Sequence, residues 1–304
     1  MTQNALIFIV SQPRSGSTYL QNLLSNNEQV NTCSEPWVLL NYAAQIKPKL
    51  VQGTYDHKFA VAALEAYGDS FEKKFLSDRL RDHLLSIYAP MAKGYSFVID
   101  KTPRYWEILP EIADLFPEAK IIVLKRDPAA VVRSMLTTYH MKSVGELLRF
   151  SRDLLFGPKK IQAFLKQNET NNQVYSLRYE DLIDQTASCV KELYDWAGIT
   201  YSDAVLNTAN NTKFKGYFGD PYQNKPKATK GELPSWATKF LNGYEDFLGA
   251  DFLEEYGNYQ LSSTAQKTNH FNAYKFFSAG QHEPASAGFK SWLKRRYFGL
   301  LGIK

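Results

Sequence analysis

The chain has 304 residues, of which 44% are hydrophobic and 14% aromatic, so it is long enough to bury one large core. Its formal net charge is +5, but residues 287–304 hold five basic and no acidic side chains, which leaves the rest of the chain neutral. A neutral body argues against a nucleic-acid-binding surface. The two cysteines, Cys33 and Cys189, are too few for a disulfide framework.

The N-terminal sequence MTQNALIFIV has no basic segment, and its apolar run is short. No apolar run approaches the roughly eighteen residues of a membrane span. We therefore expect a protein without a secretory signal, located in the cytoplasm.

Short β-rich runs alternate with longer helical patterns along the chain. Strands are predicted at 6–10, 30–33, 96–100, 120–124 and 173–177. Helices are predicted at about 17–27, 57–90, 104–115, 129–140, 145–167, 180–196 and 236–255. Strands separated by helices indicate an α/β fold with a mostly parallel central sheet flanked by helices. In such sheets ligands bind at the carboxyl ends of the strands.

The first strand runs into the polar stretch SQPRSGST. Gly16 permits backbone geometry that other residues avoid, and the amides that follow it open a helix, whose N-terminus attracts anions. Arg14 adds a permanent charge, and Ser15, Ser17 and Thr18 add hydroxyl donors. The pattern is typical of a strand–loop–helix that binds a 5′-phosphate or phosphosulfate. The alternative is an ordinary turn capped by serine and threonine.

A P-loop for ATP would place glycine and lysine where Ser11 and Ser17 stand. The lysine that reaches the phosphates of ATP is therefore missing. A small-molecule kinase is the alternative enzyme that this loop leaves open.

The fourth strand ends in a second polar stretch, KRDPAAVVRS. Asp127 suits a helix N-cap and Pro128 suits the first helical position. Arg126 lies at the strand end and Ser134 about two turns into the helix, so both can reach one anion. Alternatively, Arg126 pairs with a local carboxylate and Ser134 is a small packing residue.

Four stretches in this order resemble the sulfotransferase family that uses 3′-phosphoadenosine 5′-phosphosulfate (PAPS), especially its bacterial and carbohydrate-type members. They are PRSGST, DKTPRYWEILPEIADLFPEAKIIVLKRDP, YSLRYEDLIDQ with LYDWAGI, and GDP followed by PSWATKFLNGYEDFLGADFLEEYG. The likeness runs from about residue 6 to 258. We expect a sulfotransferase domain at 1–260, followed by a linker and a basic amphipathic extension at 261–304.

The resemblance assigns the donor site to residues of these stretches. It implies that the 5′-phosphosulfate is held by Arg14, Ser15, Gly16, Ser17 and Thr18. Arg126 and Ser134 match the pair that grips the 3′-phosphate, and Lys230 matches a basic residue that closes over it, although Lys225 or Lys227 could take that part. Tyr19 and Tyr179 match aromatic positions near the adenine, and Tyr179 could equally be a core tyrosine at a helix start.

The catalytic base differs between branches of the family. Members that sulfate phenols and steroids carry a histidine where this chain has Pro103, in DKTPR. By similarity to carbohydrate- and tyrosine-type members, Glu35 in CSEPW is the general base, and Lys101 neutralises charge on the sulfuryl oxygens or on the bridging oxygen. The alternatives are an exposed loop glutamate and a solvated strand-end lysine.

The resemblance implies in-line transfer of a sulfuryl group from PAPS to a hydroxyl, giving 3′,5′-adenosine bisphosphate (PAP). A carbohydrate or other aliphatic alcohol is the favoured acceptor, although a lipid alcohol is compatible with the apolar residues between 37 and 95. No metal is expected, because the five histidines show no metal-ligand spacing. A non-catalytic scaffold that binds PAP remains the alternative from another class. The basic C-terminal helix either packs on the domain or contacts a partner or a membrane surface.

Overall fold

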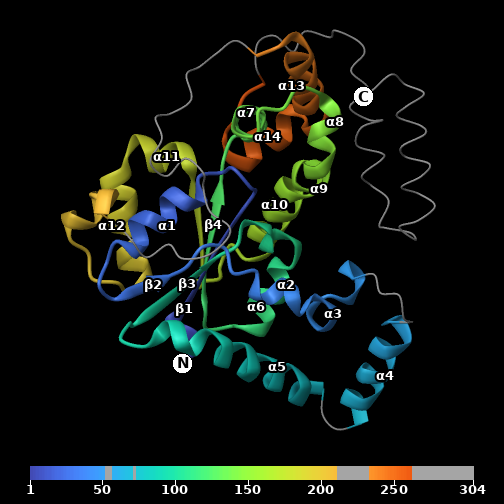
Figure 1. Cartoon of the computed structure of the whole chain (residues 1–304), viewed down its shortest axis with the longest axis vertical. Helices are drawn as coiled ribbons and strands as arrows, with labels where there is room; N and C mark the ends of the chain where they lie inside the picture. The colour runs from blue at the N-terminus through green and yellow to red at the C-terminus, as the bar shows by residue number, and fades with distance from the viewer. Residues whose placement is uncertain (52–56, 71–72, 211–232, 262–304) are drawn as a thin grey trace. The chain divides into compact units, whose positions relative to one another are not determined.

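The computed structural model describes residues 1–51, 57–70, 73–210 and 233–261 (Figure 1). Lys230 and the extension beyond residue 261 lie outside the described residues, so the predictions made for them stay predictions. The chain divides into two compact units. The sheet unit comprises the described residues within 1–11, 16–124 and 163–221, and the helical unit those within 12–15, 125–162 and 222–304.

The sheet unit is built on five strands in the order β2-β3-β1-β4-β5. β1 runs parallel to both β3 and β4, and β2 runs parallel to β3. This architecture confirms the predicted α/β fold with a parallel central sheet, and all five predicted strands are present. Their bounds are β1 Leu6–Ser11, β2 Val30–Thr32, β3 Phe97–Lys101, β4 Lys120–Lys125 and β5 Val174–Arg178.

Both faces of the sheet are covered by apolar side chains. Successive residues of a strand point to opposite faces. Ile7 and Ile9 therefore pack in a core cluster with residues of α1 (Ser17–Ser25) and α12 (Thr186–Ala197). Phe8 points the other way, with its ring centroid 5.5 Å from that of Phe116. Two covered faces explain why β1 is an uninterrupted apolar run rather than an alternating one.

The remaining elements of the sheet unit connect or cover these strands, and α4 packs against α5. The helices are α2 Val38–Asn41, α3 Ala43–Ile46, α4 His57–Ser70, α5 Lys73–Tyr88, α6 Leu109–Leu115 and α11 Tyr179–Asp184. The 3₁₀ turns are η1 Gln3–Ala5, η2 Pro48–Leu50, η3 Ala89–Ala92, η4 Pro103–Glu107, η6 Asp203–Leu206 and η7 Thr208–Asn210.

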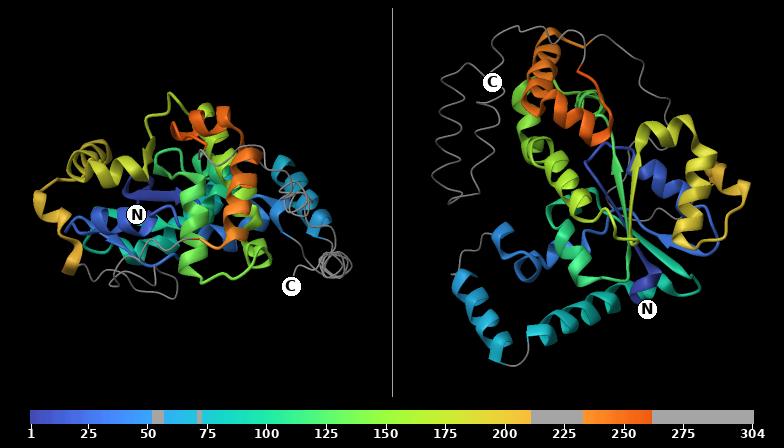
Figure 2. Two further views of the ribbon diagram at one scale, coloured as in Figure 1. Left: turned by 90° about the horizontal axis from the view of Figure 1, so that it is seen from above. Right: turned by 180° about the vertical axis from the view of Figure 1, so that it is seen from behind.

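The helical unit packs helices from two distant parts of the sequence. α13 contacts α7 and α8, and Figure 2 shows the orange α13 and α14 beside the green helices from both viewpoints. The hydroxyl of Tyr244 in α13 donates a hydrogen bond of 2.8 Å to the carbonyl of Leu154 in α9. The elements of the helical unit are α7 Pro128–Thr138, α8 Val144–Leu147, η5 Leu148–Phe150, α9 Ser151–Leu155, the first part of α10 Gly157–Gln167, α13 Ser235–Leu248 and α14 Ala250–Gly257.

Several helices predicted as continuous are interrupted. The segment predicted at 236–255 breaks at Gly249, whose φ of 85° is incompatible with a right-handed helix. The segment predicted at 180–196 breaks at Gln185, which has φ −131° and ψ 46°. Buried apolar residues occur on both sides of each break, so the apolar pattern of the sequence does not mark either break. Among the described residues, no helix combines the length and apolarity needed to cross a membrane.

Candidate active site

The loop between β1 and α1 has an unusual backbone at two positions. Arg14 has φ 71° and Gly16, the N-cap of α1, has φ 89°, so both occupy the left-handed region. A Cβ atom placed on Gly16 would lie 2.3 Å from Cδ2 of Tyr179, the first residue of α11. The ring of Tyr179 therefore packs directly on Gly16. Both the positive φ of Gly16 and this contact require a glycine at position 16.

Ser15 places a buried hydroxyl in the same loop. Its side chain is 1% exposed, and its Oγ has no hydrogen-bond partner among the described residues. The backbone N–H of Ser15 donates to the carbonyl of Gln12 at 3.3 Å, so the turn itself is closed. A buried hydroxyl without a partner costs about 1–3 kcal/mol. A bound anion that accepts from this hydroxyl would remove that cost, so the residues present fit a phosphate or phosphosulfate group.

Three predicted anion-binding residues come together in the helical unit. The guanidinium Nη1 of Arg126 donates to the carbonyl oxygen of Arg14 at 2.8 Å. Nε of Arg14 in turn lies 3.5 Å from Oγ of Ser134 in α7. The N–H of Ala129 donates to Oδ1 of Asp127 at 2.9 Å, which confirms the predicted N-cap of α7. Two guanidinium groups and a hydroxyl are the donors that bind phosphate in proteins.

The predicted base and its cation form an ion pair in the sheet unit. Nζ of Lys101, at the end of β3, lies 2.9 Å from Oε1 of Glu35, which follows β2. The Lys101 side chain is 1% exposed and that of Glu35 is 20% exposed. Nζ of Lys101 also donates to Oγ1 of Thr18 in the first turn of α1 at 3.4 Å. A carboxylate, an ammonium group and a hydroxyl thus meet where the carboxyl ends of β2 and β3 face the start of α1.

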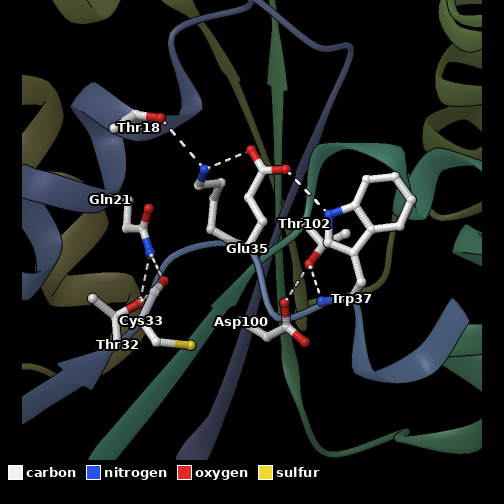
Figure 3. A network of polar contacts seen from close by, with 9 residues as sticks. Thr18, Gln21, Thr32, Cys33, Glu35, Trp37, Asp100 and Thr102 are labelled. Carbon is white, nitrogen blue, oxygen red and sulfur yellow. Dashed lines mark hydrogen bonds and ion pairs between the residues drawn. The ribbon is translucent and has the colours of Figure 1, made fainter. Parts of the chain in front are cut away.

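Trp37 is a contact of Glu35 that the sequence analysis missed. Its indole Nε1 donates to Oε2 of Glu35 at 3.3 Å, and Figure 3 shows the ring turned toward the carboxylate. The guanidinium of Arg104 lies 5.9 Å from the centroid of the same ring. Trp37 has φ 53°, a left-handed conformation that is rare for a bulky residue. The signal in the sequence that could have indicated this contact is the position of Trp37, two residues after the predicted base.

Asp100 is a second group that the sequence analysis missed, although it stands directly before Lys101. Its carboxylate is fully buried and accepts hydrogen bonds from Thr102 (2.8 Å), Tyr88 (2.6 Å) and Tyr105 (2.8 Å). Burial raises the pKa of Asp100 from its ordinary 3.8 to about 6, against the opposing effect of these hydrogen bonds. Nothing in the sequence distinguishes this aspartate from one that ends a strand in solvent.

The other predicted residues are placed less distinctively. Ser17 is buried at the first position of α1. Tyr19 and Tyr179 are partly buried and pack against the core cluster on the α1 face of the sheet. That placement agrees with the alternative interpretation of Tyr179 as a core tyrosine, and the adenine roles of both residues stay predictions. Across the described ranges, no group of three or more His, Cys, Asp or Glu side chains could hold a metal ion.

The sheet order and the parallel pairing of its strands define an α/β protein. Residues 6–203 match the sequence model described as the sulfotransferase family. The chain therefore belongs to the sulfotransferase family, and the resemblance inferred from its four motifs is confirmed.

Individual relatives are distant. Nodulation protein NoeE of Sinorhizobium fredii (strain NBRC 101917 / NGR234) is 28% identical over 287 residues, which cover 83% of this chain and 65% of the relative. Protein-tyrosine sulfotransferase 1 of Danio rerio is 24% identical over 203 residues, which cover 66% of this chain and 55% of the relative. A solved structure, the sulfotransferase domain from the curacin biosynthetic pathway, aligns with 98% of this chain and 97% of its own at a TM-score of 0.47 and 16% identity. The chain spans 65% of the length of NoeE and 55% of that of the protein-tyrosine sulfotransferase.

Proposed function

We propose that this chain transfers the sulfuryl group of PAPS to a hydroxyl of an acceptor alcohol. The products are a sulfate ester and PAP. Membership of the sulfotransferase family supports the class of reaction. The observation that carries the proposal is the pair of Glu35 and Lys101 beside Thr18, because sulfuryl transfer to an alcohol needs a proton acceptor next to positive charge.

The donor side of the proposal rests on the loop after β1 and the start of α7. The hydroxyls of Ser15, Ser17 and Thr18 and the amides after Gly16 take the 5′-phosphosulfate. The buried Ser15 hydroxyl, which lacks a partner among the described residues, supports a ligand in this loop.

Arg126 and Ser134 take the 3′-phosphate in this proposal. Their contacts with the carbonyl and the side chain of Arg14 support a shared anion-binding role. Tyr19 and Tyr179 are proposed to contact the adenine, and Lys230 the 3′-phosphate.

The chemistry follows from the charges that these residues carry. Glu35 accepts the proton of the acceptor hydroxyl, whose oxygen bonds to sulfur as the bond from sulfur to the bridging phosphate oxygen breaks. Lys101 offsets the negative charge of the sulfuryl oxygens, and Arg14 offsets the charge that develops on the leaving 5′-phosphate. Thr18 donates to an oxygen of the same group. No metal is needed for this charge compensation.

The acceptor is proposed to be a carbohydrate or another aliphatic alcohol. Glu35 supports this class, because Pro103 stands where the members that act on phenols carry a histidine base. An aliphatic hydroxyl is less acidic than a phenol, so the base must be held close to it and in a fixed orientation. Lys101 and Trp37 each donate a hydrogen bond to one oxygen of the Glu35 carboxylate, which supports such fixed placement.

Calorimetric titration of the purified chain with PAP, 5′-AMP and ADP tests the donor site. We expect PAP to bind at least about tenfold more tightly than 5′-AMP, a difference of about 1.4 kcal/mol. Arg126→Ala should abolish this preference, whereas Arg133→Ala, which removes an exposed arginine of α7, should keep it. Equal affinity for PAP and 5′-AMP, or equal losses in both variants, would count against PAPS as the donor. Preference for ATP would favour a kinase, and tight PAP binding without transfer to any acceptor would favour a scaffold.

A further inference from the structure

Beneath the Glu35–Lys101 pair lies a buried hydrogen-bond network that the proposed reaction does not use directly. It consists of Asp100, Thr102, Tyr88 and Tyr105. We propose that Asp100, acting through Thr102 and Tyr105, is the positioning residue that holds the segment Glu35–Leu39 and thereby fixes the catalytic base. The inference rests on the proposed function, since it assigns residues that serve Glu35.

The direction of the hydrogen bonds follows from the chemistry of the carboxylate. An ionised carboxylate accepts hydrogen bonds and donates none. The hydroxyls of Thr102, Tyr88 and Tyr105 must therefore each point their single proton at Asp100. Their lone pairs are then left to accept from other donors.

Two of these three hydroxyls hold the base-bearing segment. The backbone N–H of Trp37 donates to Oγ1 of Thr102 at 3.4 Å (Figure 3), and the backbone N–H of Leu39 donates to the hydroxyl of Tyr105 at 3.0 Å. The amides of Trp37 and Leu39, on either side of Val38, are thus each linked to the Asp100 carboxylate through one intervening hydroxyl group. Tyr88 donates to the same carboxylate from α5, and no hydrogen bond joins it to residues 35–39.

The anchored backbone sets the place of the Trp37 side chain. Trp37 has a left-handed φ of 53°, and such a conformation persists in a bulky residue only where the surroundings hold it. In this conformation its indole Nε1 reaches Oε2 of Glu35, while Lys101 holds Oε1. The contact of Trp37 with Glu35 therefore depends on the Asp100 network, whereas the ion pair of Lys101 with Glu35 does not.

Asp100 is ionised under ordinary assay conditions, so the arrangement is present where activity is measured. Burial raises its pKa to about 6, which is still below neutral pH. The titratable groups that face it are Tyr88 from α5, Tyr105 from η4, Lys101 beside it in β3 and Cys33 after β2. Both tyrosines have pKa values raised well above their ordinary value by burial and by Asp100, so they remain hydroxyl donors.

The test compares three variants that each remove one hydroxyl from the Asp100 carboxylate. Thr102→Val and Tyr105→Phe also remove an acceptor of the segment Glu35–Leu39, whereas Tyr88→Phe does not. We expect Thr102→Val and Tyr105→Phe to lower kcat about tenfold or more while PAP affinity stays within about twofold. Tyr88→Phe should leave kcat within about twofold, and Thr102→Ser, which keeps the hydroxyl, should restore it.

Amide hydrogen exchange gives a readout that does not depend on activity. The Trp37 amide should exchange at least about tenfold faster in Thr102→Val, and the Leu39 amide in Tyr105→Phe, with neither changed in Tyr88→Phe. Unchanged exchange at both amides, or an equal loss of kcat in Tyr88→Phe, would overturn the positioning role. If the unmodified protein shows no transfer, the proposed function fails while the exchange experiment still decides whether Asp100 anchors this segment.

Discussion

The ammonium group of Lys101 lies 2.9 Å from the carboxylate of Glu35, although 66 residues separate them in the sequence. Lys101 ends β3 and Glu35 follows β2, and these two strands are parallel neighbours. Parallel pairing brings both carboxyl ends to one edge of the sheet, so the pair forms where α/β proteins bind their ligands. Since Lys101 is almost fully buried, its charge requires this partner.

Replacing Glu35 with glutamine should abolish most of the transfer activity. The amide keeps the size of the side chain and an oxygen acceptor for Lys101, but it cannot take a proton. We expect kcat to fall about 10²–10⁴-fold, the usual range for loss of a general base, with PAP affinity nearly unchanged. Steady-state assays and calorimetry measure the two quantities. The matched control is Glu28→Gln, an exposed glutamate of the same unit, and retention of activity in Glu35→Gln would mean that the base is another group.

Glu35 and Lys101 should behave as one catalytic unit in a double-mutant cycle. Lys101→Met leaves the Glu35 carboxylate without its ion-pair partner, so the remaining base is misplaced. We expect each single variant to lose about 100-fold or more in kcat, and the double variant to lose little more than the worse single one. Single-turnover rates at saturating PAPS provide the measurement, with Lys93→Met as the exposed-lysine control. If the fold-losses in kcat of the two single variants multiply in the double variant, the two residues act independently.

Gly16→Ala should destabilise the chain more than a comparable glycine substitution elsewhere. Gly16 and Gly94 have φ values of 89° and 80°, but only the Cβ at Gly16 would meet a neighbour, the Tyr179 ring at 2.3 Å. Both alanines carry a left-handed strain of about 1–2 kcal/mol. The clash should add a further cost of about 1–3 kcal/mol at Gly16 alone.

Urea unfolding of both variants in the unmodified and Tyr179→Ala backgrounds separates strain from clash. Removing the ring should reduce the cost of Gly16→Ala to that of Gly94→Ala. An unchanged gap between the two glycines in the Tyr179→Ala background would refute the close packing of this ring on the loop.

Asp100 should make stability fall as the pH rises through the mildly acidic range. Its pKa is about 6 in the folded protein against an ordinary 3.8, so the folded state binds the proton more tightly than the unfolded state. Stability is therefore lost between about pH 4 and pH 6 and is constant above, with a total change of about 3 kcal/mol from this group.

Asp100→Asn removes this titration and provides the reference. The free energy of unfolding of both proteins is measured in urea at pH 4 and pH 7. Between these two pH values, that of the unmodified protein should fall by up to about 3 kcal/mol more than that of the variant. A constant difference between the two proteins at both pH values would contradict the raised pKa.

Local patterns in the sequence predicted all five strands and the approximate positions of the helices. The apolar runs of the five strands, the Asp127–Pro128 start of α7 and the glycine-containing turn before α1 all act through neighbouring residues, by side-chain alternation, capping and backbone freedom. The same short-range signals gave the α/β class and, through four motifs in order, the family. They missed the helix breaks at Gln185 and Gly249 and the 3₁₀ turns η4 and η5 in the segments predicted as helices at 104–115 and 145–167, because an apolar pattern does not mark where a helix is interrupted.

Contacts between distant residues were decided only by the tertiary structure. The sequence could not say that Trp37 would reach Glu35, that Tyr179 would lie on Gly16, or that Asp100 would be buried under three hydroxyls. These contacts depend on which strands become neighbours, and the order β2-β3-β1-β4-β5 follows from the packing of whole faces rather than from any local pattern. The sequence by itself therefore determined the type of protein and its candidate residues, whereas packing determined which of those residues meet and what holds them in place.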